Sequence, residues 1–269
     1  MDESLTYARY LRIAELLGLQ NTKSDPSDRD EVLFIIVHQV YELWFKQLLV
    51  EADAVIRDLI EGRALAALKS LKRMHTIQRV IIQQIDVLET MTPVDFLEFR
   101  NLLGSASGFQ SVQFRCVEIA SGGGNPKILS YFVEKGDLEE IQKRLRKPTM
   151  FDALLSFLWR QGYPIDNRFL VPGATRGSNR KIDSSIVSVF KNVYQNNSRG
   201  GAFYEAYLLL EHFVEYDELW SLWRNRHLQM VERTIGTKRG TGGSNGTAYL
   251  ASTLSSRFFP ELWDVRREL

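Results

Sequence analysis

The chain has 269 residues, enough for one domain or for two of ordinary size, and it can bury a large core without disulfides or structural metals. Hydrophobic residues make up 44% of the sequence and charged residues 25%, which excludes disordered, collagen-like and low-complexity proteins. The formal net charge of +1 provides no overall field that would hold nucleic acid or an anionic membrane.

Cysteine usage and the N-terminal sequence indicate a cellular location. Cys116 is the single cysteine, so an internal disulfide and a cysteine-rich zinc site are both excluded, as is usual in a reducing compartment. The chain starts with acidic residues and lacks the apolar stretch of a secretory signal. The longest continuous apolar run, 32–37, is far shorter than the roughly 20 residues that cross a bilayer. We therefore expect a cytoplasmic protein that binds neither membrane nor nucleic acid.

The first third of the chain is predicted to be helical. Leucines and alanines at helical spacing predict a helix over 5–19, followed by a polar connector around Pro26. Nothing interrupts the pattern from about Asp30 to Glu61, and Gly62 is a stop signal. A second long helix is expected over 63–91, where leucine and isoleucine recur at intervals of three and four.

The remaining predicted elements are helices and loops. Thr92 as N-cap, Pro93 at the first helical position and Asp95 in the first turn predict a helix that ends before Gly104. Further helices are predicted over 109–120, 126–132, 137–146, 148–162, 183–195 and 201–235, with an irregular loop over 163–182. No segment has the alternating pattern of a strand. The fold class expected is all-α, with residues 1–269 forming one domain built as a bundle of long helices.

Four histidines are the candidates for metal or cofactor chemistry, since no metalloprotease, nucleophile-elbow or Walker motif is present. A metal held by the protein alone would need histidines from distant helices, whereas a haem needs only one axial histidine. His75 has polar neighbours and is expected to be solvated, and His212 is expected to be a surface or packing residue.

His38 and His227 allow two interpretations each. His38 shares a helical face with Phe34 and Tyr41 in the most apolar stretch of the chain. It is either a core histidine bonded to a backbone carbonyl or a histidine beside an aromatic ligand. His227 lies late in a long helix and is either an ordinary residue of an amphipathic helix or an axial ligand.

Two further features suggest a ligand pocket. Residues 236–246 contain five glycines. Three interpretations are open for this segment: a flexible loop, a phosphate-binding loop, or a lid over a cofactor pocket. Arg100 lies one helical turn after Phe96, an arrangement that suits a carboxylate clamp beside an apolar wall. The commoner alternative for Arg100 is a surface salt bridge with Glu98 or Asp95.

Five segments in this order resemble the tryptophan 2,3-dioxygenase family. They extend over most of the chain, and the second and the last are long and specific. The segments are LTYARYL, FIIVHQVYELWFKQ, TPVDFLEFR, SASGFQSVQFR and RHLQMVERTIGTKRGTGGSNG. The resemblance implies a homotetrameric enzyme with haem b that opens the indole ring of L-tryptophan with O₂, giving N-formylkynurenine.

The resemblance also implies roles for individual residues. His227 corresponds to the axial ligand of the haem iron. His38 corresponds to the catalytic position, where it meets the indole N–H, although addition of O₂ across the indole C2–C3 bond requires no general base. Arg100 corresponds to the carboxylate clamp and Thr241 to the loop residue that holds the substrate ammonium and carboxylate. The other expected substrate contacts are Phe34, Ile35, Ile36, Val37, Phe96 and Ser107, with Tyr7, Tyr10 and Leu11 reaching a neighbouring subunit's pocket.

Two other functions are compatible with these residues. One is a haem monooxygenase that acts on tryptophan or a methylated tryptophan in natural-product biosynthesis. The other is a protein that binds haem or tryptophan without turnover. Arg100, His38 and Thr241 together argue for an amino-acid pocket and against a simple haem carrier.

Overall fold

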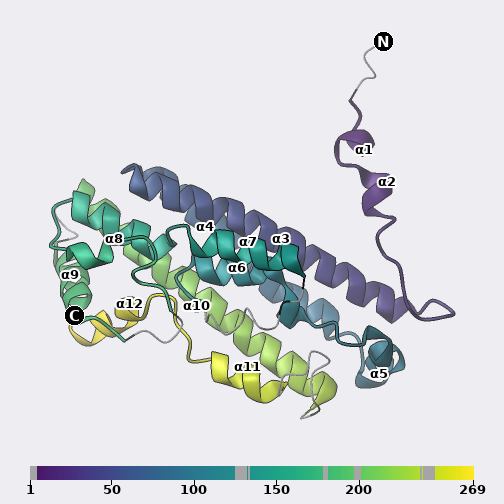
Figure 1. The fold of residues 1–269 in the computed structure, drawn as a ribbon. Coiled ribbons are helices and arrows are strands. Elements are labelled where there is room, and N and C mark those ends of the chain that lie inside the picture. Colours follow the sequence, from purple (N-terminus) through teal and green to yellow (C-terminus); the bar gives the residue numbers. More distant parts are fainter. Residues whose placement is uncertain are drawn as a thin grey trace.

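The computed structural model describes residues 5–124, 132, 134–177, 181–196, 201–236, 238 and 246–269. Within these ranges every regular element is a helix, and no strand is found (Figure 1). The all-α fold class is therefore confirmed.

Three long helices form the centre of the molecule: α3 (Arg29–Ile60), α4 (Ala64–Leu88) and α10 (Ala202–Ile235). Helix α4 packs against both α3 and α10, and α6 (Val112–Ala120) and α8 (Met150–Arg160) cover other parts of α3 (Figure 1). Their apolar faces meet in one continuous core that includes Leu48, Leu71 and Phe213, none of which is exposed. Each such side chain contributes about 1.5–3 kcal/mol to stability through its removal from water.

The turn after α3 forms at Gly62, where the sequence predicts that the helix stops. Gly62 has φ +80°, a conformation that costs other residues energy but not glycine. This turn lets the Arg63 N–H donate to the Asp58 carbonyl at 2.7 Å, and α4 starts directly afterwards. The two long antiparallel helices are thus joined by a minimal connection.

The remaining helices include two that the sequence pattern did not predict. Helix α5 (Pro93–Arg100) starts with the expected capping box between Thr92 and Asp95, and α9 (Ser184–Gln195) starts after its N-cap Asp183. Helix α7 (Lys135–Leu145) packs on α6. The unpredicted helices are α11 (Thr247–Thr253) and α12 (Pro260–Asp264), which follow the glycine-rich segment. Short 3₁₀ turns occupy Asn101–Leu103, Gly108–Gln110, Asn167–Phe169 and Val265–Arg267.

The N-terminal segment departs from its prediction as one helix over 5–19. It forms two single turns, α1 (Tyr7–Tyr10) and α2 (Ile13–Leu16), separated by Arg12 in the left-handed conformation at φ 52°. Both turns project from the body of the molecule and bury no residue (Figure 1). An amphipathic helix this short gains its stability from packing, and here no described residue of the same chain buries its apolar face.

Among the described helices, α3 is the one whose length and mean hydropathy would suit a membrane span. It is also the helix that packs against α4, α6 and α8 and contributes Leu48, Val55 and Leu59 to the core. The central helix of a globular bundle has this same composition.

His75 corrects a sequence prediction. It was expected to be solvated because its sequence neighbours are polar, but its exposed fraction is 2%. Helix α10 covers this side of α4, and that contact joins residues more than 130 positions apart in the chain. His212 is half-buried in the same contact, as expected for a packing residue.

Candidate active site

A cavity of about 300 Å³ lies where α3, α5, α6, α10, α11 and the end of α4 meet. Its wall is mainly apolar and aromatic, with a few polar groups, which is the usual character of a small-molecule site. The lining residues are Phe34, His38, Tyr41, Glu42, Phe45, Leu88, Met91, Phe96, Ser107, Gly108, Phe109, Ser111, Phe114, Arg115, Glu118, Trp223, Arg224, His227, Met230, Val231, Thr234, Ile235, Gly246, Tyr249, Leu250 and Thr253.

Helix α3 contributes Phe34, His38 and Tyr41 because residues three and four apart share one helical face. The rings of Phe34 and His38 are 4.1 Å apart between centroids. Phe34 also contacts Phe96 of α5 at 5.8 Å, so two helices build one aromatic wall. The Tyr41 hydroxyl donates to the Ile81 carbonyl at 2.7 Å, which fixes this part of α3 against α4.

The tautomer of His38 follows from its hydrogen bond. Nδ1 lies 2.7 Å from the Phe34 carbonyl oxygen, which only accepts, so Nδ1 carries the proton and donates. Burial lowers the pKa of His38, so the ring is neutral near neutral pH. Its Nε2 is therefore a hydrogen-bond acceptor.

His227 enters the cavity from α10, the helix opposite. Its ring stacks on Trp223 with centroids 5.1 Å apart and planes 6° from parallel. Neither ring nitrogen hydrogen bonds to any described residue. Burial, together with the neighbouring His38, lowers the pKa of His227 to about 4. A neutral imidazole with an uncommitted lone pair thus lines an apolar cavity, as an axial metal ligand requires.

Two buried arginines supply positive charge to the cavity wall. Arg115 contacts Glu118 at 2.5 Å and lies over the Phe109 ring. Arg224 donates to the Ser256 carbonyl at 3.0 Å and lies over the Phe258 ring. Both side chains are less than 10% exposed. The cavity wall therefore holds two cationic groups together with the carboxylates of Glu42 and Glu118, and Arg115 is already paired with Glu118.

The structure brings together five of the residues predicted for the site: Phe34, His38, Phe96, Ser107 and His227. They come from α3, α5, the turn before α6, and α10. Ser107 Oγ accepts from the Phe109 N–H at 3.3 Å and so shapes that turn.

Arg100 is not among the residues that line the cavity. It is the last residue of α5, one turn beyond Phe96, and is half-buried. Thr241 lies outside the described residues, as does most of the glycine-rich loop.

Three other predicted substrate contacts, Ile35, Ile36 and Val37, are not among the residues that line the cavity. Ile35 and Ile36 lie one and two positions after Phe34, so they point away from the face that Phe34 and His38 share. Val37 is buried in the core, and its carbonyl accepts from Gln84 Nε2 at 2.8 Å. Ile36 points outward, with an exposed fraction of 42%.

The predicted residues of the N-terminal segment also lie away from their own cavity. Tyr7, Tyr10 and Leu11 are 76%, 71% and 43% exposed on the projecting turns. None of the three lines the cavity formed by the described residues of their own chain.

The sequence interpretation missed several lining residues, among them Tyr41, Trp223, Phe114 and Tyr249. A signal existed for the first two. Tyr41 follows His38 by three positions, and Trp223 precedes His227 by four, so each shares its histidine's helical face. Tyr249 has no such signal, because its position depends on how α11 folds back against α10.

Comparison with known proteins points to one family. The family model described as tryptophan 2,3-dioxygenase matches residues 1–164 and 139–269. The tryptophan 2,3-dioxygenase of Herpetosiphon aurantiacus is 43% identical over the full length of both chains. That of a Nocardioides species is 44% identical, covering 98% of this chain and 95% of the relative. That of Myxococcus xanthus is 41% identical, covering 98% and 89%.

Proposed function

Since the chain belongs to the tryptophan 2,3-dioxygenase family, we propose that it is a haem-dependent oxidoreductase that opens the indole ring of L-tryptophan with O₂ to give N-formylkynurenine. The observation that carries this proposal is the placement of His38 and His227 in one apolar cavity between α3 and α10. One histidine has a free acceptor nitrogen, and the other has both ring nitrogens unbonded to the described residues. An indole N–H needs an acceptor such as the first, and a haem iron needs an imidazole such as the second.

The residues of the cavity fit a haem b group. His227 would be the axial ligand, because burial keeps its imidazole neutral. The aromatic side chains Trp223 and Phe114 would pack against the macrocycle, and Arg115 and Arg224 would pair with its carboxylates. Haem, when bound, supplies the activation of O₂ that no side chain can provide.

His38 would orient the substrate. Its Nε2 accepts the indole N–H, because Nδ1 is already committed to the Phe34 carbonyl. Phe34 and Phe96 pack against the apolar ring system and exclude water from it. No residue has to remove a proton from carbon, so His38 acts by positioning.

The amino-acid end of the substrate needs charged partners at the edge of the cavity. We assign the carboxylate to Arg100 and the carboxylate and ammonium to Thr241, by correspondence with the family. Arg100 fits this role because Phe96, one turn earlier on α5, lies in the cavity wall. An arginine at that edge forms a paired, charge-assisted contact with a carboxylate.

We propose a cytoplasmic homotetramer in which Tyr7, Tyr10 and Leu11 of one subunit complete the cavity of another. The support is the high exposure of these three side chains on turns that bury nothing in their own chain. The segment leaves the body beside the start of α3, where Gln39 Nε2 donates to the Leu19 carbonyl at 3.1 Å. That end of α3 also carries Phe34 and His38.

The proposal is tested by the absorption spectrum and turnover of the purified protein. A Soret band is expected, and the anaerobically reduced protein given L-tryptophan and O₂ should accumulate N-formylkynurenine. His227→Ala should lose stable haem binding while circular dichroism still shows a helical fold.

Gln229→Ala is the matched control, because it changes an exposed residue two positions later on the same helix, outside the cavity, and should retain haem. Wild-type haem content and spectrum in the His227→Ala variant would overturn the axial assignment. A haem protein that leaves tryptophan unchanged would overturn the dioxygenase function.

A further inference from the structure

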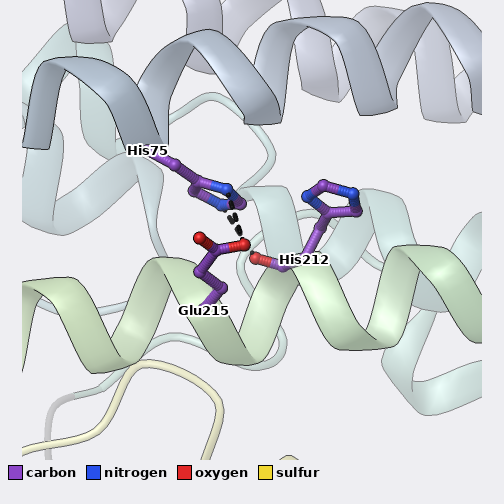
Figure 2. A group of neighbouring side chains, drawn as sticks. All are labelled: His75, His212 and Glu215. Atoms are coloured by element: carbon purple, nitrogen blue, oxygen red, sulfur yellow. Dashed lines mark hydrogen bonds and ion pairs between the residues drawn. The ribbon is translucent and has the colours of Figure 1, made fainter.

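A second group of ligand-bearing side chains lies between α4 and α10, outside the cavity (Figure 2). His75 comes from α4, and His212 and Glu215 come from one face of α10. Each offers one ligand atom, and these atoms lie within 4.8 Å of one another. At 1.5 Å of rise per residue, His212 is about 22 Å along α10 from His227, so the group is separate from the cavity.

One contact of the His75 ring places two hydrogen-bond acceptors next to each other. Nε2 lies 3.0 Å from the His212 carbonyl oxygen, so Nε2 carries the proton and donates. Nδ1 then has a lone pair, yet it lies 3.1 Å from Glu215 Oε2, which also has only lone pairs. With the ring 98% buried, the neutral form is favoured, and two acceptors face each other. A cation near these atoms satisfies both.

The third ligand atom is also unsatisfied. His212 Nδ1 is shielded from solvent and has no hydrogen-bond partner among the described residues. The His212 ring lies beside that of His75, with centroids 5.2 Å apart. Glu215 is 37% exposed and so gives the group an opening to solvent.

We propose that His75, His212 and Glu215 bind a divalent transition metal, which we assign as zinc, and that this ion ties α4 to α10. Two imidazoles and one carboxylate, with a water in the fourth position, form a normal zinc ligand set. The N–H of His75 bonded to a backbone carbonyl is the outer contact that metal-bound histidines usually have. The ligand set is too hard for a soft ion and too rich in nitrogen for calcium or magnesium.

Neighbouring charges orient the site and limit its affinity. Arg79, one turn after His75, pairs with the other oxygen of Glu215 and so holds the carboxylate in place. Burial lowers the pKa of the His212 ring, and the nearby Lys72 lowers it further. Tetrahedral zinc ligands lie about 3.3 Å apart, so side-chain rotation must bring the three groups slightly closer together on binding.

The test uses the haem-loaded protein after dialysis against a chelator and then against zinc sulfate. Elemental mass spectrometry should find one zinc per chain in addition to the haem iron. Zinc-edge X-ray absorption should show nitrogen and oxygen neighbours only. Zinc should also raise the unfolding midpoint, because an ion that binds only the folded state stabilises it.

Variants locate the ion. His212→Gln and Glu215→Gln remove ligands at half-exposed positions and should each weaken zinc binding at least tenfold, while His75→Gln should do the same if it folds. Glu211→Gln is the matched control, since it removes a carboxylate from the adjacent position, where Glu211 contacts Tyr194 and Arg266, and should bind zinc as the wild type does. Absence of stoichiometric zinc in the wild type, or undiminished binding by both His212→Gln and Glu215→Gln, would overturn the proposal.

Discussion

His38 donates its Nδ1 proton to the Phe34 carbonyl, which leaves Nε2 as the acceptor that the proposed substrate would meet. His38→Phe keeps an aromatic ring but removes the acceptor, so the indole N–H would be buried without a partner. An unpaired buried donor costs about 1–3 kcal/mol, and kcat/KM for L-tryptophan should fall by about five- to a hundredfold. Steady-state kinetics measures this loss.

A substrate methylated on the indole nitrogen is the control for this variant. It has no N–H to donate, so its kcat/KM should change much less between wild type and His38→Phe. Equal losses for both substrates would contradict the role of His38 as an acceptor.

Cys116 is buried between α6 and α7, and burial raises the pKa of its thiol to about 11. Only the thiolate reacts with disulfide reagents, and three pH units below the pKa about one molecule in a thousand carries it. At pH 8 the native protein should therefore react at least about a hundredfold more slowly than the urea-unfolded chain. Labelling of the native protein at the rate of a free thiol would contradict this.

Residue-level predictions succeeded where the information was local to one helix. The spacing of Phe34 and His38 placed both in the cavity wall. Ile35 and Ile36, predicted together with them as substrate contacts, are not in the cavity wall because successive positions of a helix point in different directions. His75 was misjudged because its burial depends on α10, which no local pattern around Lys72 or Arg73 reports.

At the scale of elements, Asp217 of α10 holds the C-terminal segment in place. Its carboxylate is buried and accepts from the Phe258 and Phe259 N–H groups at 3.1 and 3.2 Å and from Trp263 Nε1 at 3.0 Å. Asp217→Ala leaves these donors unpaired and should lower the free energy of unfolding by at least about 2 kcal/mol in urea denaturation. Glu218→Ala, an exposed neighbour, should change it by less than about 0.5 kcal/mol. Similar effects of the two would show that Asp217 is no anchor.

The N-terminal turns α1 and α2 have a predicted role that depends on a second copy of the chain. Deleting residues 1–17 should lower activity and loosen the tetramer together, because the exposed Tyr7 and Tyr10 would be lost from the neighbouring cavity. Helical content should hardly change, since each turn has only four residues. Analytical ultracentrifugation and kinetics measure the two effects, and a truncated chain that is a fully active monomer would refute the proposal.

Helix boundaries were predictable wherever capping chemistry marks them. Thr92 and Asp95 form the expected capping box, and Asp183 caps α9. The helix predicted over 5–19 is longer than the two turns observed there. Its periodic pattern indicates an apolar face, but a short helix forms only where other residues cover that face. Helix α12 was not predicted, although Pro260 stands at its first position. The whole helix has only five residues, too few to show a helical spacing of apolar side chains.

At the scale of the whole molecule, the all-α class followed from the long periodic segments and the absence of alternating ones. The continuous core shared by α3, α4, α8 and α10 supports our proposal that residues 1–269 form one domain. The cavity could not be predicted from the sequence, since its walls come from six helices whose packing depends on long-range contacts. The convergence of His38 and His227 emerges only at this scale.

The central claim is that this chain inserts both atoms of one O₂ molecule into tryptophan. The most direct measurement is mass analysis of the product formed from L-tryptophan under isotopically labelled dioxygen in unlabelled water. We expect N-formylkynurenine that contains both labelled oxygen atoms. A product with a single labelled atom would identify a monooxygenase, and a product without label, its oxygen drawn from water, would exclude oxygenase chemistry; either result would contradict the dioxygenase function.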